Sequence, residues 1–136
     1  MRFPTKVAIV VREDLAGWQK LNVTAFLASG VAHASDGIMG LPYEDGSGNT
    51  YLAMLREPVL VYAADAAGLT RTHERALRRG LPAALYPEEL FATGNDDDNR
   101  AAVKAVTVEK LALVGLGVYG PRTEVDKVTK GLTLHT

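Results

Sequence analysis

Lys20 and Thr24 are the residues of this sequence whose types and spacing best fit a chemical role. They are four positions apart in the stretch 18–33, whose apolar residues recur at helical spacing. Residues four apart on a helix are neighbours on one face. An ammonium group beside a hydroxyl can bind an anion or stabilise negative charge that develops in a reaction. The simpler interpretation of Lys20 is a solvated surface lysine.

Further polar residues follow the apolar run 6–11, which is typical of a buried strand. Arg12 and Asp14 leave the end of that strand, where open α/β sheets usually bind ligands. Thr93 and Asn95 lie in a later loop that could join the same site. The alternatives are a surface pair of Arg12 with Asp14 and a simple helix cap at Asn95.

A glycine motif precedes the last predicted helix. Gly115, Gly117 and Gly120 fit the pattern G-x-G-x-x-G between a strand and a helix, but only 16 residues follow Gly120. A dinucleotide-binding turn has an acidic residue about 20 positions after its glycine motif, and the remaining segment is too short to contain it. Gly120 and Arg122 remain candidates for binding a phosphate or carboxylate, through free backbone amides and a guanidinium at the helix start. The alternative is a plain turn.

Strands and helices alternate along the chain. This order predicts one α/β domain over residues 1–136, a three-layer α/β/α sandwich around a mixed, mostly parallel sheet of about four strands. Trp18 is expected in its core. A glycine-rich tip between two apolar arms predicts a β-hairpin insertion at about 38–55. The expected strands are 6–11, 58–64, 83–86 and 112–118, and the expected helices are 18–33, 66–79, about 95–103 and 121–130.

The composition excludes several classes of function. The net charge is −1 and the chain has no cysteine, which argues against a global attraction to nucleic acid and excludes thiolate sites. The three histidines lack metal-ligand spacing, so we expect no metal and no cofactor. No apolar run is long enough to span a membrane, and a cytoplasmic location is expected. Arginines at 71, 75, 78 and 79 predict a charged outer helix face, with an RNA-backbone patch as the alternative.

Three blocks of the sequence resemble the type 2 peptidyl-tRNA hydrolases. The segment 11–15 is similar to their V-R-x-D-L, and Lys20-Leu21 starts a similar lysine-led helix. The segment 115–132 resembles their C-terminal G-x-G, G-P and D-K-V-T-G-x-L motifs. The hairpin and the segment 90–95 are closer to a bacterial family known as "domain of unknown function two thousand", thought to share that fold. Against that family the similarity extends over nearly the whole chain.

The resemblance implies roles for particular residues. Lys20 matches the lysine of the hydrolases and would stabilise developing charge, whereas Thr24 replaces their glutamine and Leu27 their histidine. Their aspartate and arginine after the third strand are absent here, and Glu88 or Glu89 would have to serve as the base.

Three functions follow from these observations. The favoured one is binding of a small anionic or nucleotide-like ligand near Arg12, Lys20, Thr24 and Arg122. The second is a diverged hydrolase of peptidyl-tRNA or a related ester or amide. The third is an interaction protein that forms a homodimer through its hairpin.

Overall fold

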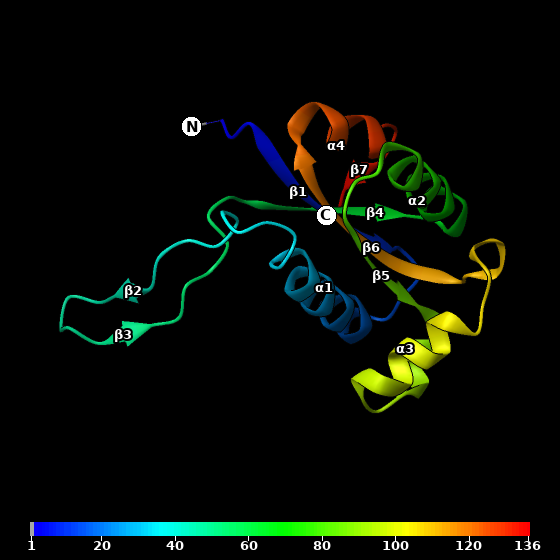
Figure 1. The fold of residues 1–136 in the computed structure, drawn as a ribbon, viewed down its shortest axis with the longest axis horizontal. Coiled ribbons are helices and arrows are strands. Elements are labelled where there is room, and N and C mark those ends of the chain that lie inside the picture. The colour runs from blue at the N-terminus through cyan, green and yellow to red at the C-terminus, as the bar shows by residue number, and fades with distance from the viewer. Residues whose placement is uncertain (1) are drawn as a thin grey trace.

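A computed structural model describes residues 2–136 and contains a five-stranded sheet with the order β5-β6-β1-β4-β7 (Figure 1). Four α-helices and two short 3-10 helices accompany it, and a separate hairpin is formed by β2 (Tyr43–Glu44) and β3 (Thr50–Tyr51). The strands of the main sheet are β1 (Thr5–Arg12), β4 (Val59–Ala64), β5 (Ala83–Pro87), β6 (Leu113–Pro121) and β7 (Thr133–Leu134). The helices are α1 (Gly17–Val31), α2 (Ala66–Arg79), η1 (Glu88–Ala92), α3 (Asp96–Lys104), η2 (Val108–Lys110) and α4 (Arg122–Val128).

The prediction of a mostly parallel sheet of about four strands was wrong. β1 and β4 are parallel, but β5–β6, β6–β1 and β4–β7 are antiparallel. The sheet is mostly antiparallel because the chain reverses its direction before β6. β1, β4 and β5 run in one direction, but η1, α3 and η2 then turn the chain back, so that β6 enters between β5 and β1 from the opposite end. β7 adds a further strand beside β4.

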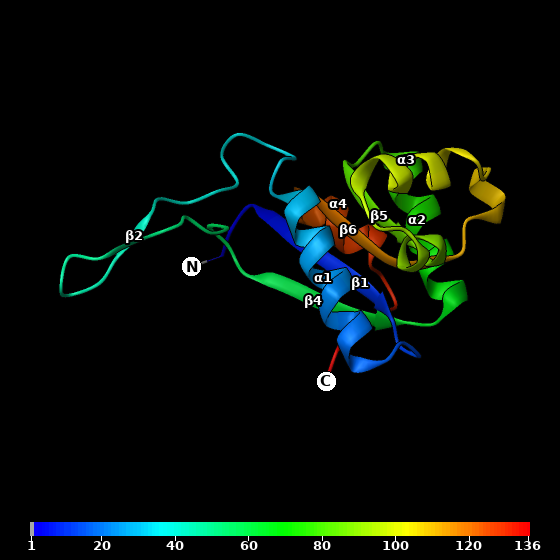
Figure 2. The ribbon, with the colours of Figure 1, turned by 90° about the horizontal axis from the view of Figure 1, so that it is seen from below.

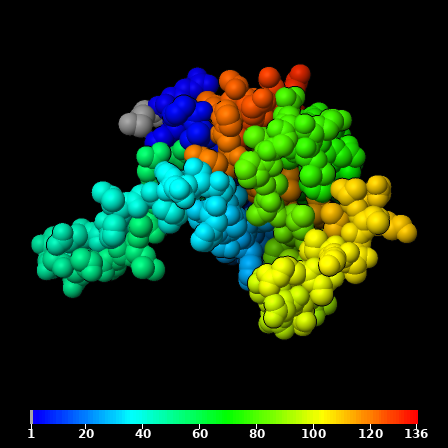
Figure 3. Space-filling model, viewed as in Figure 1, coloured from blue at the N-terminus to red at the C-terminus, as the bar shows by residue number. Residues whose placement is uncertain are grey.

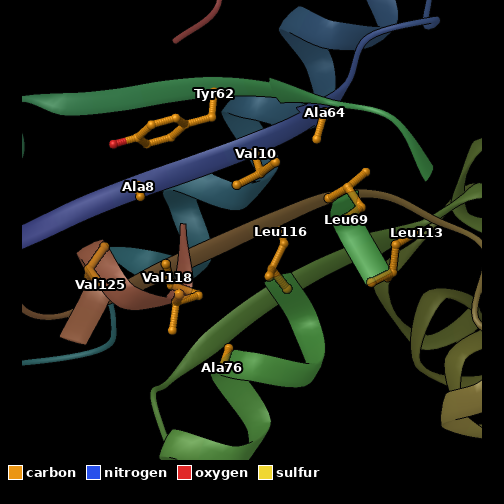
Figure 4. Packing of buried hydrophobic residues seen from close by; sticks show 11 residues of the cluster. Ala8, Val10, Tyr62, Ala64, Leu69, Ala76, Leu113, Leu116, Val118 and Val125 are labelled. Carbon is orange, nitrogen blue, oxygen red and sulfur yellow. The ribbon is translucent and has the colours of Figure 1, made fainter. Parts of the chain in front are cut away.

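Helices cover both faces of the sheet, as the sequence predicted. α1 lies on one face, and α2 and α4 lie on the other (Figures 1 and 2). The alternation along β1 follows this division, because Ala8 and Val10 point to the side of α2 and α4 whereas Ile9 and Val11 point to α1. Figure 4 shows the first of these clusters, which includes Val10 of β1, Leu116 of β6 and Leu69 of α2. All these side chains are buried.

The glycines of β6 allow α1 to approach the sheet closely. A Cβ atom on Gly115 would lie 2.5 Å from Cγ1 of Val23 and 2.8 Å from Cδ1 of Leu27. On Gly117 it would lie 3.0 Å from Cγ2 of Val31. The G-x-G motif is therefore explained by helix packing, without any ligand.

Replacing Gly115 with Ala is expected to destabilise the protein by about 1–3 kcal/mol, the usual cost of overpacking a core. The reason is that the new methyl group has to displace Val23 or Leu27. The measurement is urea-induced unfolding. Gly17→Ala is the control, because a Cβ there meets no atom within 4 Å. Equal midpoints for the two variants would contradict this account of the motif.

Helix α1 is apolar on its outer side as well as on the side facing the sheet. Val23 and Leu27 are buried, but Trp18 is 65 % exposed, Leu21 75 % and Phe26 53 %. The prediction that Trp18 belongs to the core was therefore wrong. Its helical spacing is real, yet the apolar stripe of α1 is wider than the sheet can cover.

The predicted hairpin is present, and it projects from the rest of the protein (Figure 3). Asp45 organises its turn, because Oδ1 accepts hydrogen bonds from the backbone amides of Ser47 and Asn49 at 2.9 and 3.0 Å. Oδ2 accepts from the Tyr51 hydroxyl at 2.7 Å. Hydrogen bonds from Asn49 and then Tyr51 hold the pKa of the Asp45 carboxyl far below its usual value.

Helix α2 begins and ends as its sequence predicts. The Asp65 side chain accepts a hydrogen bond from the Gly68 amide, and Gly80 ends the helix in the left-handed conformation with φ 63°. Its outer face carries the four arginines. Arg79 pairs with Glu124 at 3.1 Å and Arg75 donates to the Lys130 carbonyl oxygen at 2.9 Å, so two of them stabilise contacts within the protein.

His73 faces inward from α2 and makes the stability pH-dependent. Burial lowers its pKa, and the nearby Glu74 opposes this shift only in part. The unfolded chain therefore binds this proton more readily than the folded protein does. We expect the stability to fall as the pH decreases below the unfolded histidine pKa of about 6.5.

The measurement is urea unfolding at several pH values for the wild type and for His73→Gln. The variant should lose less stability on acidification than the wild type. His33→Gln, at an exposed position, is the control and should behave like the wild type. An unchanged pH dependence in His73→Gln would contradict the prediction.

Within residues 2–136, none of the helices has both the length and the apolar character that crossing a membrane requires.

Candidate functional site

Helix α1 starts shortly after β1 ends and presents Lys20 and Thr24 on one face. Gly17 is its first residue, and a Cβ atom there would meet no other atom within 4 Å. Both Lys20 and Thr24 are half-buried. The Thr24 hydroxyl donates to the Lys20 carbonyl oxygen at 2.7 Å, so its proton is already used and only its lone pairs are available.

His135 is the residue that meets Lys20. The pairing of β7 with β4 brings it there, and the His135 amide donates to the Val61 carbonyl oxygen at 2.8 Å. Lys20 Nζ then lies 3.1 Å from His135 Nε2. The other ring nitrogen, Nδ1, is 2.7 Å from the Thr136 carbonyl oxygen.

One tautomer of a neutral His135 fits these two contacts of its ring. An ammonium group can only donate, so Nε2 must be the acceptor, and a carbonyl oxygen can only accept, so Nδ1 must carry the proton. A neutral imidazole protonated at Nδ1 satisfies both contacts. Lys20 is thereby held in place by a neutral partner and keeps its positive charge uncompensated.

A groove of about 670 Å³ lies between α1 and the edge of the sheet formed by β4 and β7. We call it the Lys20 groove. Apart from the Lys20 ammonium, the Thr24 hydroxyl and the His135 ring, its walls are apolar. Among residues 2–136, no carboxylate forms an ion pair with Lys20. It is lined by Val11, Gly17, Lys20, Leu21, Thr24, Ala25, Val61 and His135.

Arg12, Asp14 and Glu88 form a separate ion cluster. Arg12 Nε donates to Asp14 at 2.6 Å, and its Nη2 donates to Glu88 at 2.9 Å. The hydrogen bond to Asp14, and then that to Glu88, raises the pKa of the guanidinium. Two carboxylates therefore neutralise Arg12, which makes this cluster a poor site for an anion. Glu88 does not line the Lys20 groove, so the structure does not place the predicted base beside the predicted stabiliser.

Gly120 and Arg122 lie at the opposite end of the sheet from Arg12. Gly120 pairs with Lys6 near the start of β1, whereas Arg12 ends that strand. The expectation of one site containing both Arg12 and Arg122 was therefore wrong, because β6 is antiparallel to β1. The Arg122 amide also donates to the Pro4 carbonyl oxygen, and its guanidinium donates to that of Phe3, both at 2.9 Å.

Thr93 and Asn95 lie on the far side of α1 from Lys20. Asn95 caps α3, because its side-chain oxygen accepts from the Asp98 amide at 2.9 Å. The Thr93 hydroxyl shares its proton between the Leu90 carbonyl oxygen, at 3.0 Å, and Asn99 Oδ1. Both residues line a second groove between α1 and α3, so they do not join the site at Lys20.

Sequence reasoning missed His135. No spacing pattern in the sequence connects His135 with Lys20, because the two residues are 115 positions apart. The one indication in the sequence was that His135 follows the segment 115–132 closely. Only the pairing of β7 with β4, a tertiary contact, brings the two residues together.

Comparison with known proteins gave two findings. The model of a family described as "Protein of unknown function (DUF2000)" matches residues 5–136. A solved structure of a protein of unknown function from Agrobacterium tumefaciens strain C58 is similar to this chain, with 44 % identity and a TM-score of 0.95. The similarity covers 99 % of this chain and 100 % of that one. The search of curated proteins gave no match.

Proposed function

Because the chain belongs to the DUF2000 family, whose description names no activity, we propose its function from the geometry of the Lys20 groove. The groove binds a small organic anion with an apolar body, such as a carboxylate or a phosphate monoester. The observation that carries this proposal is the ammonium of Lys20, which forms no ion pair among residues 2–136 and lies at the wall of an otherwise apolar groove.

The contacts of Lys20 support this ligand class. Its ammonium has three protons, and the neutral His135 ring accepts one of them. The others are free to bind an anionic oxygen, and charge-assisted hydrogen bonds of this kind are stronger than neutral ones. Leu21, Ala25 and Val61 would contact an alkyl or aryl group. At about 670 Å³, the groove is within the usual range of ligand pockets.

The test is a calorimetric titration with octanoate, with octanol as the uncharged control of similar size. We expect octanoate to bind to the wild-type protein at least tenfold more tightly than octanol. Equal affinities would mean that the ammonium does not select the ligand, and would overturn the proposal.

A diverged hydrolase is the second candidate, and the pair of Lys20 with His135 favours it. If the Lys20 ammonium turned from His135 Nε2 to the oxyanion that forms, it would stabilise that oxyanion and leave Nε2 free to accept a proton from water. The corresponding test is release of tRNA from peptidyl-tRNA, measured beside an authentic type 2 peptidyl-tRNA hydrolase. Turnover within about 100-fold of that enzyme, a barrier difference of about 2.7 kcal/mol, would support the hydrolase. Turnover no higher than in buffer would exclude it.

We also propose that the fold is similar to that of the type 2 peptidyl-tRNA hydrolases, in a bacterial family. The support is that the three blocks of resemblance come together around one sheet. The segment 11–15 ends β1, Lys20 lies on α1, and the segment 115–132 forms the larger part of β6 and α4. The cytoplasmic location, the binding of tRNA, the homodimer through the hairpin and the single domain stay predictions.

A further inference from the structure

A second groove lies on the other side of α1, between this helix and the segment η1–α3. It consists of two adjoining hollows of about 440 and 570 Å³ that share several lining residues, among them Phe26, Tyr86 and Asn99. We call it the aromatic groove. The Lys20 groove and its proposed ligand play no part in the inference below.

Four aromatic rings form a connected wall in this groove. Trp18 meets Phe91 with ring centroids 6.1 Å apart, Phe91 meets Tyr86 at 5.2 Å, and Tyr86 meets Phe26 at 5.9 Å. Tyr86 is buried and contacts both Phe26 and Phe91. Trp18 and Phe26, at 65 % and 53 % exposure, leave ring surface open at the rim. The exposed ring of Trp18 offers a surface on which a planar ring can stack.

Two amide side chains in the same hollow have unused hydrogen-bonding groups. Asn99 accepts a hydrogen bond from the Thr93 hydroxyl through Oδ1, and its Nδ2 has no partner among residues 2–136. Asn22 donates through Nδ2 to the Tyr86 hydroxyl at 3.4 Å, and its Oδ1 has no partner in the same part of the chain. The hollow therefore offers the unpaired amide nitrogen of Asn99 as a donor and the unpaired amide oxygen of Asn22 as an acceptor.

We propose that the aromatic groove binds an amino-substituted heteroaromatic ring of the adenine type. The ring stacks on Trp18, a ring nitrogen accepts a hydrogen bond from Asn99 Nδ2, and the exocyclic amino group donates to Asn22 Oδ1. The nearby carboxylate of Asp96 pairs with Arg100 at 2.5 Å.

Trp18 makes this proposal directly measurable, because it is the single tryptophan of the chain. We expect adenosine to quench Trp18 fluorescence with a saturating curve. Inosine is the matched ligand control, because it presents a ring N–H and a carbonyl oxygen where adenosine presents an acceptor and an amino group. Inosine should bind at least about threefold more weakly, which corresponds to the loss of one hydrogen bond. Quenching that rises linearly without saturation, or equal curves for the two nucleosides, would overturn the proposal.

Two variants of equal charge locate the hydrogen bonds. Asn99→Asp keeps the acceptor for Thr93 but removes the free donor, whereas Asn22→Asp keeps the free acceptor. We expect Asn99→Asp to weaken adenosine binding by about threefold to tenfold more than Asn22→Asp does. Lys20→Met should leave adenosine binding unchanged and so separates this site from the Lys20 groove. The same affinity in both Asp variants, with far-ultraviolet circular dichroism like that of the wild type, would overturn the assignment.

Discussion

Replacing Lys20 with Met is expected to weaken octanoate binding by about tenfold to a hundredfold. Methionine retains much of the apolar length of the side chain but removes the ammonium. A hydrogen bond to a charged group contributes about 1.5–3 kcal/mol, which corresponds to this change in affinity. Because Lys20 has the neutral His135 as its side-chain partner, its loss leaves no buried charge behind. Calorimetric titration of the variant measures the effect.

Two controls make this result specific. Octanol should bind equally to the wild type and to Lys20→Met, since the variant keeps the apolar walls of the groove. Lys110→Met removes an exposed lysine at a distant place, η2, and should bind octanoate like the wild type. If Lys20→Met and Lys110→Met had the same affinity for octanoate, the role assigned to Lys20 would be wrong.

Introducing histidine at position 27 is expected to destabilise the protein by about 3 kcal/mol or more. The proposed resemblance to the type 2 peptidyl-tRNA hydrolases aligns their histidine with this position, so on that alignment the change restores an enzyme residue. Leu27 is only 1 % exposed, however, and lies against Gly115 and Gly117 of β6. The substitution removes a packed leucine and buries an imidazole among apolar neighbours.

The comparison for this variant is Leu27→Met, which conserves volume and should cost less than about 1.5 kcal/mol. Urea unfolding of both variants gives the two free energies. A Leu27→His protein as stable as Leu27→Met would show that the position has access to water or to a polar partner. The packing of α1 on β6 described above would then be incorrect.

Local patterns predicted most of the elements of this fold. The continuous apolar run of β1, the cap at Asp65 and the glycine-rich hairpin tip each depend on neighbouring residues, and each is confirmed. The direction of the strands was harder to predict. The chain returns through η1 and α3 outside the sheet, and no local pattern states that β6 will lie between β5 and β1.

The site could be predicted only in part, for the same reason. The spacing of Lys20 and Thr24 on one helix face is a local property, and the two residues do share a groove. Arg122 and His135 depend on strand pairing. The antiparallel β6 carries Arg122 away from the sheet end expected for it, and β7 brings His135 to Lys20. Trp18 is exposed because the sheet covers only part of the apolar surface of α1. The helical spacing of apolar residues does not indicate how much of that surface will be covered.

The most direct test of the central claim is to map octanoate binding by nuclear magnetic resonance on the ¹⁵N-labelled protein. The account predicts that the backbone amide signals of Thr24, Val61 and His135 shift together with one dissociation constant. The signals of Asn95 and Asn99, in the aromatic groove, should not move. Shifts confined to the aromatic groove or to the hairpin, with Thr24 and His135 unchanged, would contradict the assignment of the Lys20 groove as the anion site.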